Sequence, residues 1–294
     1  MENSSSSPLV SVCLITYNHE EYITQAIESV LMQKLDCDWE FIIADDCSSD
    51  KTSQIVENYA NANPNLIRKL DNSTNLGAGK NFVRLLDAAK GKYIAYLEGD
   101  DYWTDIEKLQ RQFNYMQENK RISLCYHKVD WVFTMPYVHN VEESNTDDNE
   151  FYTFQDLFQR GWFIRSCSMF FKNIDLPKKF DKLYIGDFTL HVLLANIGDI
   201  GFINKRMATY RINHNGASET KLSNLSSKQE LQKSINHIKM LAFLVKNVRF
   251  KYRKIVLFKM AINTKGTINL LGKITLKKCL KLLNFSKKNP YSVE

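Results

Sequence analysis

Short apolar runs alternate with longer segments of helical periodicity through the first third of the chain, and this alternation constrains the fold most strongly. The apolar, β-rich runs are Leu9–Thr16, Trp39–Asp45, Tyr93–Leu97 and a weaker one at Leu66–Leu70. Uninterrupted apolar runs of this kind are typical of parallel strands that are buried on both faces. We therefore expect these segments to be strands of one mostly parallel sheet.

Apolar residues recur at helical spacing between these runs. A helix is expected at Glu20–Gln33, and another after Ser48, Ser49 and Asp50, whose side chains favour the N-cap position. The expected helical faces consist of Ile23, Ala26, Ile27, Val30 and Leu31, then Ile55, Val56, Tyr59 and Ala60, then Phe82, Leu85, Leu86 and Ala89. The alternation predicts an α/β fold, with a mostly parallel, Rossmann-like sheet flanked by helices.

Beyond Asp105 the alternation weakens, so the predictions there are fewer. They are strands at Ile122–Tyr126 and Ile200–Asn204, a strand-like segment at Met207–Ile212, a helix at Thr189–Asn196 and a polar, acidic loop at Met135–Glu150. From Leu225 onward the chain has the pattern of helices with basic faces. We expect a main domain at 1–224 and a basic helical C-terminal extension at 225–294.

Charge is divided unevenly between these two segments. Residues 225–294 contain 16 Lys and Arg against 2 Asp and Glu, whereas residues 1–224 contain 23 against 31. Basic residues interleaved with apolar ones, as in Val245–Phe258, are typical of helices that lie on an anionic membrane surface. Packing of the extension on the acidic main domain is the alternative. No base-reading motif accompanies the basic residues, so a nucleic-acid partner is not expected.

Several classes of protein are disfavoured by composition. No run of about 18 apolar residues occurs, so no membrane-spanning helix is expected. The polar N-terminal residues Met1–Ser7 lack the apolar stretch of a signal peptide, which favours a cytoplasmic location. The six cysteines form no CxxC pair, which favours reduced thiols over a zinc site. The glycine patterns of phosphate loops and dinucleotide folds are also missing.

Polar residues follow the three strongest apolar runs. In an open α/β sheet, ligands bind outside the carboxyl ends of the strands, so these residues are the candidate site. They are Thr16, Tyr17, Asn18 and His19 after the first run, Asp45 and Asp46 at the end of the second, and Glu98, Gly99, Asp100 and Asp101 after Tyr93–Leu97.

The carboxylates of this candidate site would repel one another unless a cation lies among them. Carboxylate oxygens suit the hard ions Mg²⁺ or Mn²⁺, which also bind the phosphates of substrates. The acids Asp45, Asp46, Asp100 and Asp101 therefore indicate a divalent metal and a ligand that carries a diphosphate. The alternative is that they are turn residues and helix caps.

Four segments together resemble the family 2 glycosyltransferases of the GT-A fold, in their bacterial type. They are VSVCLITYNHEEYITQAIESVLMQ, FIIADDCSSDKT, NLGAGKN and GKYIAYLEGDDYW, and they occur in the order found in that family. The resemblance extends roughly from Pro8 to Ser218. It implies that residues 1–224 are a GT-A-like catalytic domain.

The resemblance also implies roles for residues that bind the nucleotide sugar. Thr16, Tyr17 and Asn18 would line the base and ribose, and one carboxylate of Asp45 or Asp46 would accept the N–H of a uracil-like base. Lys80 and Asn81 occupy the place of the family's usual Arg-Asn pair. The full nucleotide-sugar-binding set is Thr16, Tyr17, Asn18, Asp45, Asp46, Lys80, Asn81, Glu98 and Gly99.

The family's metal-binding Asp-x-Asp motif reads Glu98-Gly99-Asp100 here and is followed by Asp101. The resemblance implies that Asp100 is the direct metal ligand and that Asp101 and His214 also belong to the metal site. Glu98 departs from the usual aspartate, although its longer side chain can still reach a ribose hydroxyl. For His214 the alternative is a structural role.

The segment YIGDFTLHVLLANIGDIGFINKRMATYRINHNGAS resembles the acceptor half of the family. It implies that Asp187 is the general base. The family often has Glu-Asp at this place, whereas here Gly186 precedes Asp187. The alternative role of Asp187 is to cap the helix expected at 188–196.

The implied activity is metal-dependent, inverting transfer of a hexosyl or N-acetylhexosaminyl group from a UDP-sugar to an acceptor hydroxyl. The implied setting is bacterial surface or lipid-linked glycan synthesis at the inner face of the cell membrane. One alternative is a nucleotidyltransferase, which should carry a Gly- and Arg-rich loop after the first strand. The other is a non-catalytic scaffold protein of the same fold.

Overall fold

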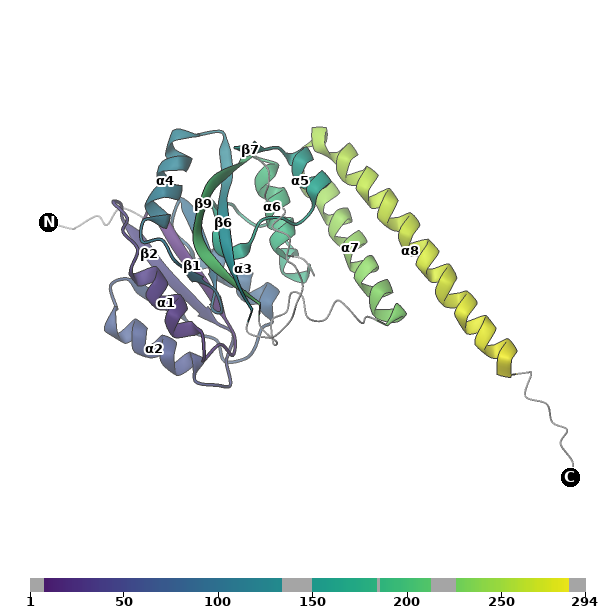
Figure 1. The fold of residues 1–294 in the computed structure, drawn as a ribbon, viewed down its shortest axis with the longest axis horizontal. Coiled ribbons are helices and arrows are strands. Elements are labelled where there is room, and N and C mark those ends of the chain that lie inside the picture. Colours follow the sequence, from purple (N-terminus) through teal and green to yellow (C-terminus); the bar gives the residue numbers. More distant parts are fainter. Residues whose placement is uncertain (1–7, 134–149, 184–185, 213–225, 286–294) are drawn as a thin grey trace, which may run out of the picture. The chain divides into compact units, whose positions relative to one another are not determined.

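The computed structural model describes residues 8–133, 150–183, 186–212 and 226–285. The chain divides into two compact units, Met1–Gly216 and Ala217–Glu294 (Figure 1). The predicted boundary after residue 224 and all of the predicted loop Met135–Glu150 except Glu150 lie outside the described residues, so the division at 224 stays a prediction.

In the described part of the first unit, nine strands form one mixed sheet in the order β3-β2-β1-β4-β8-β6-β9-β5, and β7 pairs with β9. The strands are β1 (Val10–Thr16), β2 (Trp39–Asp45), β3 (Ile67–Leu70), β4 (Tyr93–Glu98), β5 (Tyr102–Trp103), β6 (Ile122–Phe133), β7 (Phe151–Tyr152), β8 (Phe170–Lys172) and β9 (Asp199–Ile212). The four strands predicted in the first third of the chain are confirmed.

The first unit also contains six α-helices and two short 3₁₀ turns among its described residues. They are α1 (Ile23–Leu31), α2 (Thr52–Ala62), α3 (Ala78–Ala88), α4 (Lys108–Glu118), α5 (Phe154–Arg160) and α6 (Gly186–Ala195), with turns η1 (Ser166–Ser168) and η2 (Phe180–Lys182). The predicted apolar face of α1 is confirmed, because Ile23, Ala26, Ile27 and Val30 are fully buried. Burying each large apolar side chain contributes about 1.5–3 kcal/mol.

The central strands are parallel, and their carboxyl ends therefore meet at one edge. Strand β1 pairs with β2 on one side, with Thr16 opposite Asp45, and with β4 on the other, with Ile15 opposite Glu98. The α/β fold expected from the sequence is confirmed, and its register brings the three polar strand ends together.

One strand in the later part of the first unit differs from its prediction. The segments predicted as two strands at 200–204 and 207–212 form the single strand β9, which pairs in parallel with β6. Residues 204–206 are exposed, and the register shifts opposite Lys128. The apolar pattern stops at this irregularity although the backbone pairing continues through it. The short strands β5, β7 and β8 and the helices α4 and α5 were not predicted.

The second unit contains α7 (Ser227–Asn247) and α8 (Phe250–Phe285). Ser226 begins α7 with a capping box, in which its hydroxyl accepts a hydrogen bond from the Gln229 N–H. Met240, Leu241 and Leu244 of α7 are buried. No helix within the described ranges is long and apolar enough to span a membrane.

Candidate active site

Two loops are joined at the carboxyl ends of β1 and β2. The Asn18 side chain accepts a hydrogen bond from the Ser49 N–H at 2.9 Å, and the Asn18 N–H donates to the Ser48 hydroxyl at 2.9 Å. Asn18 has a positive φ of 54°, a conformation that asparagine adopts more readily than most residues. These contacts and the β1–β2 register, in which Thr16 lies opposite Asp45, hold the Thr16–Asn18 segment next to Asp45.

The two acids at the end of β2 have different partners. Asp45 accepts hydrogen bonds from both the hydroxyl and the N–H of Ser48, so it stays in the loop beside β1. Asp46 instead accepts from the N–H groups of Leu76 at 2.8 Å and Gly77 at 2.9 Å. Asp46 therefore anchors the loop before α3, whereas Asp45 is hydrogen-bonded to the loop that follows β2.

The predicted pair on α3 is split between surface and core. Lys80 is exposed, whereas Asn81 is fully buried and donates from Nδ2 to the Ala44 carbonyl at 2.9 Å. Arg84, one helical turn later, donates to Asn81 Oδ1 at 2.7 Å and approaches the Asp45 carbonyl at 3.4 Å. Sequence reasoning missed Arg84, although its spacing of three residues from Asn81 could have indicated a shared helix face.

Three carboxylates gather where β4 ends. Glu98, Asp100 and Asp101, called the acid cluster below, each offer an oxygen that lies within 4.8 Å of the other two. Asp101 is 1% exposed, and its Oδ1 accepts the Arg211 N–H at 2.7 Å. Its Oδ2 is buried without a hydrogen-bond partner among the residues that the structure describes. Glu98, which was predicted to belong to the nucleotide-sugar-binding set, lies in this cluster beside the predicted metal ligands, and its role stays a prediction.

The electrostatics of the acid cluster fit a cation. Burial, with Asp100 and Asp187 nearby, raises the pKa of Glu98 to about 8. Burial and the charges of Asp100 and Glu98 also raise the pKa of Asp101 well above its usual range. Carboxylates this close and this buried resist ionisation unless a positive charge is added. A hard divalent ion with oxygen ligands would neutralise this charge and would give the buried Oδ2 of Asp101 a partner.

Gly99 is the point of closest approach between the acid cluster and the end of β1. A Cβ at Gly99 would lie 2.5 Å from Thr16 Oγ1 and 2.9 Å from His19 Nδ1. Because real Cβ contacts are not this short, only glycine fits here without displacing a neighbour. The acid cluster is thus packed directly against the residues predicted to hold the nucleoside.

Turn η1, which precedes β8, supports the acid cluster. The Ser166 hydroxyl donates to Glu98 Oε2 at 3.0 Å. Trp103 fixes the same turn through its Nε1, which donates to the Cys167 carbonyl at 2.9 Å. Sequence reasoning missed Ser166, since no local pattern marks a serine whose partner lies 68 positions away.

Asp187 lies in the first turn of α6, and its Oδ1 accepts the Phe188 N–H at 2.9 Å. Burial raises the pKa of Asp187 to about 6, and the nearby positive charge of Arg165 acts in the opposite direction. Asp187 is also one of the charges that raise the pKa of Glu98, so the predicted base lies in the electrostatic surroundings of the acid cluster. A carboxylate with a pKa near neutrality is suited to general-base work.

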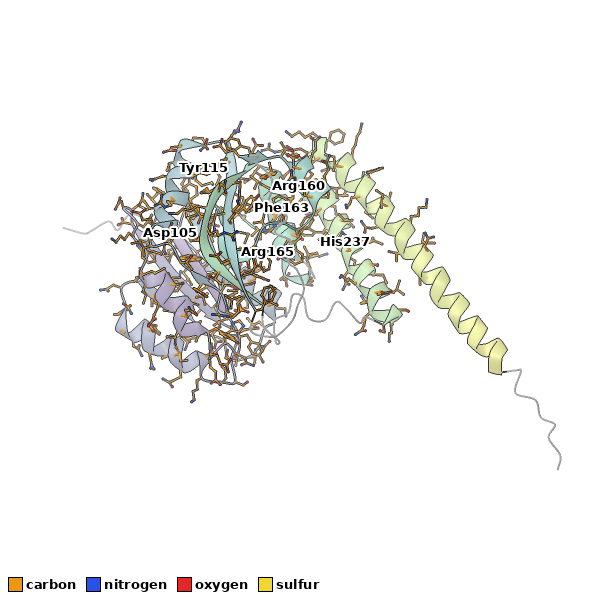
Figure 2. All side chains as sticks on the ribbon, in the orientation of Figure 1. Asp105, Tyr115, Arg160, Phe163, Arg165 and His237 are labelled. Carbon is orange, nitrogen blue, oxygen red and sulfur yellow. The ribbon has the colours of Figure 1, made fainter. Side chains whose placement is uncertain are left out.

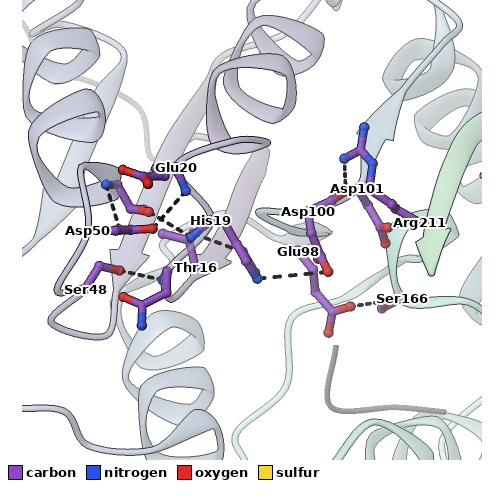
Figure 3. Close-up of polar contacts among 12 residues, drawn as sticks. Thr16, His19, Glu20, Ser48, Asp50, Glu98, Asp100, Asp101, Ser166 and Arg211 are labelled. Carbon is purple, nitrogen blue, oxygen red and sulfur yellow. Dashed lines mark hydrogen bonds and ion pairs between the residues drawn. The ribbon is translucent and has the colours of Figure 1, made fainter. Parts of the chain in front are cut away.

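Two arginines that sequence reasoning missed border the site. Arg165, labelled in Figure 2, places its guanidinium 4.6 Å from the ring centroid of Trp131 on β6. Arg211 on β9 donates to the Asp100 carbonyl (Figure 3). It also donates to Gln25 Oε1 at 2.8 Å and lies over the Tyr22 ring. The predicted metal-site residue His214 lies outside the described residues. Tyr17, predicted to line the base, is 45% exposed.

Comparison with known proteins places this site in a family. The sequence profile described as glycosyl transferase family 2 matches residues 11–175, which include the ends of β1, β2 and β4. An uncharacterized protein of Mycobacterium tuberculosis is 34% identical over 219 residues, which cover 70% of this chain and 60% of that protein. The chain therefore spans less than two thirds of the length of this relative.

Two solved structures share the fold over most of the chain. Staphylococcus aureus TarS in complex with UDP superposes with a TM-score of 0.58 and 17% identity, and the match covers 91% of each chain. A mannosyltransferase of Pyrobaculum calidifontis in complex with GDP-Man and Mn²⁺ has a TM-score of 0.57 and 11% identity, covering 96% of this chain and 80% of that one. The profile match covers more than half of the sequence and includes the strand ends that build the site, and on this evidence the chain belongs to glycosyltransferase family 2.

Proposed function

We propose that this chain is a metal-dependent, inverting glycosyltransferase that moves a sugar from a UDP-sugar to an acceptor hydroxyl. The observation that carries the proposal is the acid cluster. Within the described residues, its Asp101 has a buried Oδ2 without a hydrogen-bond partner, and the charge of Asp187, the predicted general base, helps to raise the pKa of Glu98. Membership of the family supports the reaction class.

The donor would bind across the ends of β1, β2 and β4. Thr16 and Asn18 would contact the nucleoside, and Asp45, held beside them through Ser48, would accept the N–H of the base. A pyrimidine nucleotide is supported by the UDP seen in the TarS structure. The GDP-Man complex of the other neighbour makes a guanine nucleotide the alternative that a test must include.

A divalent cation, Mg²⁺ or Mn²⁺, would be held by Asp100 and Asp101, with Glu98 beside them and the predicted His214. When bound, such a cation stabilises the negative charge of a departing nucleoside diphosphate. The protein's own contribution is to keep these carboxylates together. Arg211 does so through its bonds to the Asp101 side chain and the Asp100 carbonyl.

Asp187 would act as the base. The acceptor oxygen forms a bond to the anomeric carbon, the bond from that carbon to the diphosphate oxygen breaks, and the acceptor proton passes to the Asp187 carboxylate. Attack on the face opposite the leaving group inverts the configuration, so an α-linked donor gives a β-linked product. A positioned base typically contributes about 10²–10⁴-fold in rate.

The test is a panel of UDP-sugars and GDP-mannose, each incubated with the protein and Mn²⁺ while release of the nucleotide is measured. We expect release from one UDP-sugar and its loss when the metal is chelated. A parallel reaction with UTP and sugar 1-phosphates checks for pyrophosphate release. Pyrophosphate release without sugar transfer would indicate a nucleotidyltransferase, and binding of no nucleotide at all would indicate a scaffold.

We further propose that residues 225–294 contact an anionic membrane surface at the cytoplasmic face of the cell membrane, where a lipid-linked or surface-glycan acceptor would be met. Helix α8 exposes Phe250 (78%), Phe258 (70%) and Ile262 (53%) together with basic residues. Each Lys or Arg near anionic lipid contributes about 1 kcal/mol, and apolar side chains add insertion into the interface.

Sedimentation with vesicles that contain anionic lipid tests this membrane contact. Changing the exposed Lys251, Arg253 and Lys254 to Glu should abolish sedimentation of the full chain at low salt. A control variant with the same charge change in the first unit, at Lys34, Lys51 and Lys90, should sediment like the wild type. Equal sedimentation of the two variants would contradict the membrane contact and would favour packing of α8 on protein.

A further inference from the structure

His19 lies where the loops after three strands meet, although no role in the proposed reaction has been given to it. Its ring Nδ1 is 3.2 Å from Thr16 Oγ1 at the end of β1. Its backbone N–H donates to Thr52 Oγ1, at 2.8 Å, where the loop after β2 ends. Its Nε2 is 4.0 Å from Asp100 Oδ2 in the acid cluster (Figure 3). One side chain therefore spans the space between the predicted nucleoside site and the predicted metal ligand.

The ring packs against Gly99, which lies between Glu98 and Asp100 of the acid cluster. A single added carbon at Gly99 would come within 2.9 Å of His19 Nδ1. The carbonyl of His19 also accepts the N–H groups of Tyr22 and Ile23 at 2.9 and 2.8 Å, so its backbone belongs to the start of α1. His19 is thus held by the rigid elements on one side and faces Asp100 on the other.

The hydrogen bond at Nδ1 affects which ring nitrogen carries the proton. When Nδ1 accepts the Thr16 hydroxyl hydrogen, the neutral ring carries its proton on Nε2 and directs this N–H toward Asp100. A donor near a metal-binding carboxylate fixes which oxygen faces the ion. Residues in this position typically change metal affinity by about 10–100-fold when they are replaced.

We propose that His19 is a positioning residue for Asp100. His19 transmits the arrangement of the predicted nucleoside-binding end of β1 to the acid cluster. The inference rests on the proposed function, since it takes Asp100 as the ligand of a divalent cation. It predicts that Nε2 of His19 matters for cation affinity, whereas Nδ1 serves the packing against Thr16.

Two substitutions separate these functions of the ring. His19→Asn keeps a polar group near the place of Nδ1 but has nothing at the place of Nε2. His19→Gln can place its amide nitrogen near the position of Nε2, and so keeps an N–H group on the side that faces Asp100. A ring that only fills space between the loops would be replaced equally well, or equally badly, by the two amides.

The experiment measures Mn²⁺ binding to the full chain in the presence of UDP, with electron paramagnetic resonance reporting the free ion. We expect His19→Asn to weaken Mn²⁺ binding by about tenfold or more, and His19→Gln to stay within about threefold of the wild type. Thermal unfolding and binding of uridine without metal serve as controls for the fold and for the end of β1.

Each outcome decides the proposal. Equal weakening by Asn and Gln, or unchanged Mn²⁺ binding by His19→Asn, would overturn the positioning role while leaving the cation site intact. Failure of the wild type itself to bind Mn²⁺ with UDP would instead reject the cation site of the proposed function, and this inference with it.

Discussion

Replacing Asp187 by Asn should raise stability and remove activity, and the opposite signs make this substitution informative. Asn is nearly isosteric with Asp, and its side-chain oxygen can still accept the Phe188 N–H that Asp187 Oδ1 accepts at 2.9 Å. This hydrogen bond in the first turn of α6 is therefore preserved. The change removes the negative charge and the ability to take a proton.

The effect on stability follows from the pKa. Burial raises the pKa of Asp187 from an ordinary 3.8 to about 6, so ionisation of this group costs free energy in the folded chain. A difference of about two pKa units corresponds to about 3 kcal/mol at most. The folded state binds this proton more tightly, so the wild type loses stability as the pH rises from about 4 to about 6. Asp187→Asn should be more stable than the wild type above this window, and the gain should vanish below it.

The effect on activity has the reverse pH dependence. A base works when ionised, so wild-type turnover should fall about tenfold from pH 7 to pH 5 for a pKa of about 6. The Asn variant should keep donor binding and lose about 10²–10⁴-fold in turnover.

Thermal unfolding from pH 4 to pH 8 and nucleotide release at saturating Mn²⁺ measure the two effects. A variant that keeps more than about a tenth of wild-type turnover would show that Asp187 is not the base. A variant less stable than the wild type at pH 7.5 would show that the buried charge is compensated and that the pKa reasoning is wrong.

Three further outcomes are expected. Asp100→Ala should abolish transfer and the Mn²⁺ dependence of UDP binding while the unfolding temperature stays near that of the wild type; calorimetric titration showing unchanged Mn²⁺ dependence would contradict the metal assignment. Gly99→Ala should lower the free energy of unfolding by about 1–3 kcal/mol and weaken UDP binding, because the new Cβ would lie 2.5 Å from Thr16 Oγ1. Unfolding in urea and UDP titration measure the two effects, and an unchanged urea midpoint would contradict the prediction. Gly266→Ala in α8, where a Cβ meets nothing within 4 Å, should stabilise the helix by about 1 kcal/mol, and helical circular dichroism on heating is the check.

Local pattern alone predicted the elements that place the site. The apolar runs of β1, β2 and β4 are nearly continuous because both faces of a central parallel strand are buried, and such runs are visible in any short window. The polar residues that follow them had to meet at one edge, because parallel strands end on the same side. The sequence by itself therefore determined the fold class, the candidate edge and the acids at the end of β4, namely Glu98 in its last position and Asp100 and Asp101 after it.

Only the tertiary structure decided which partners these residues have. Asp46 bonds to Leu76 and Gly77, Glu98 accepts from Ser166, and Asp101 accepts from Arg211, across separations of 30 to 110 positions. Periodicity reports which face of an element is buried, but it carries no information about the element that covers that face. Strand β8, which inserts antiparallel between β4 and β6, is too short to show a period at all, yet the turn before it holds Glu98. The division of labour among the carboxylates is set by these long-range contacts, because burial and neighbouring charge come from residues distant in the chain.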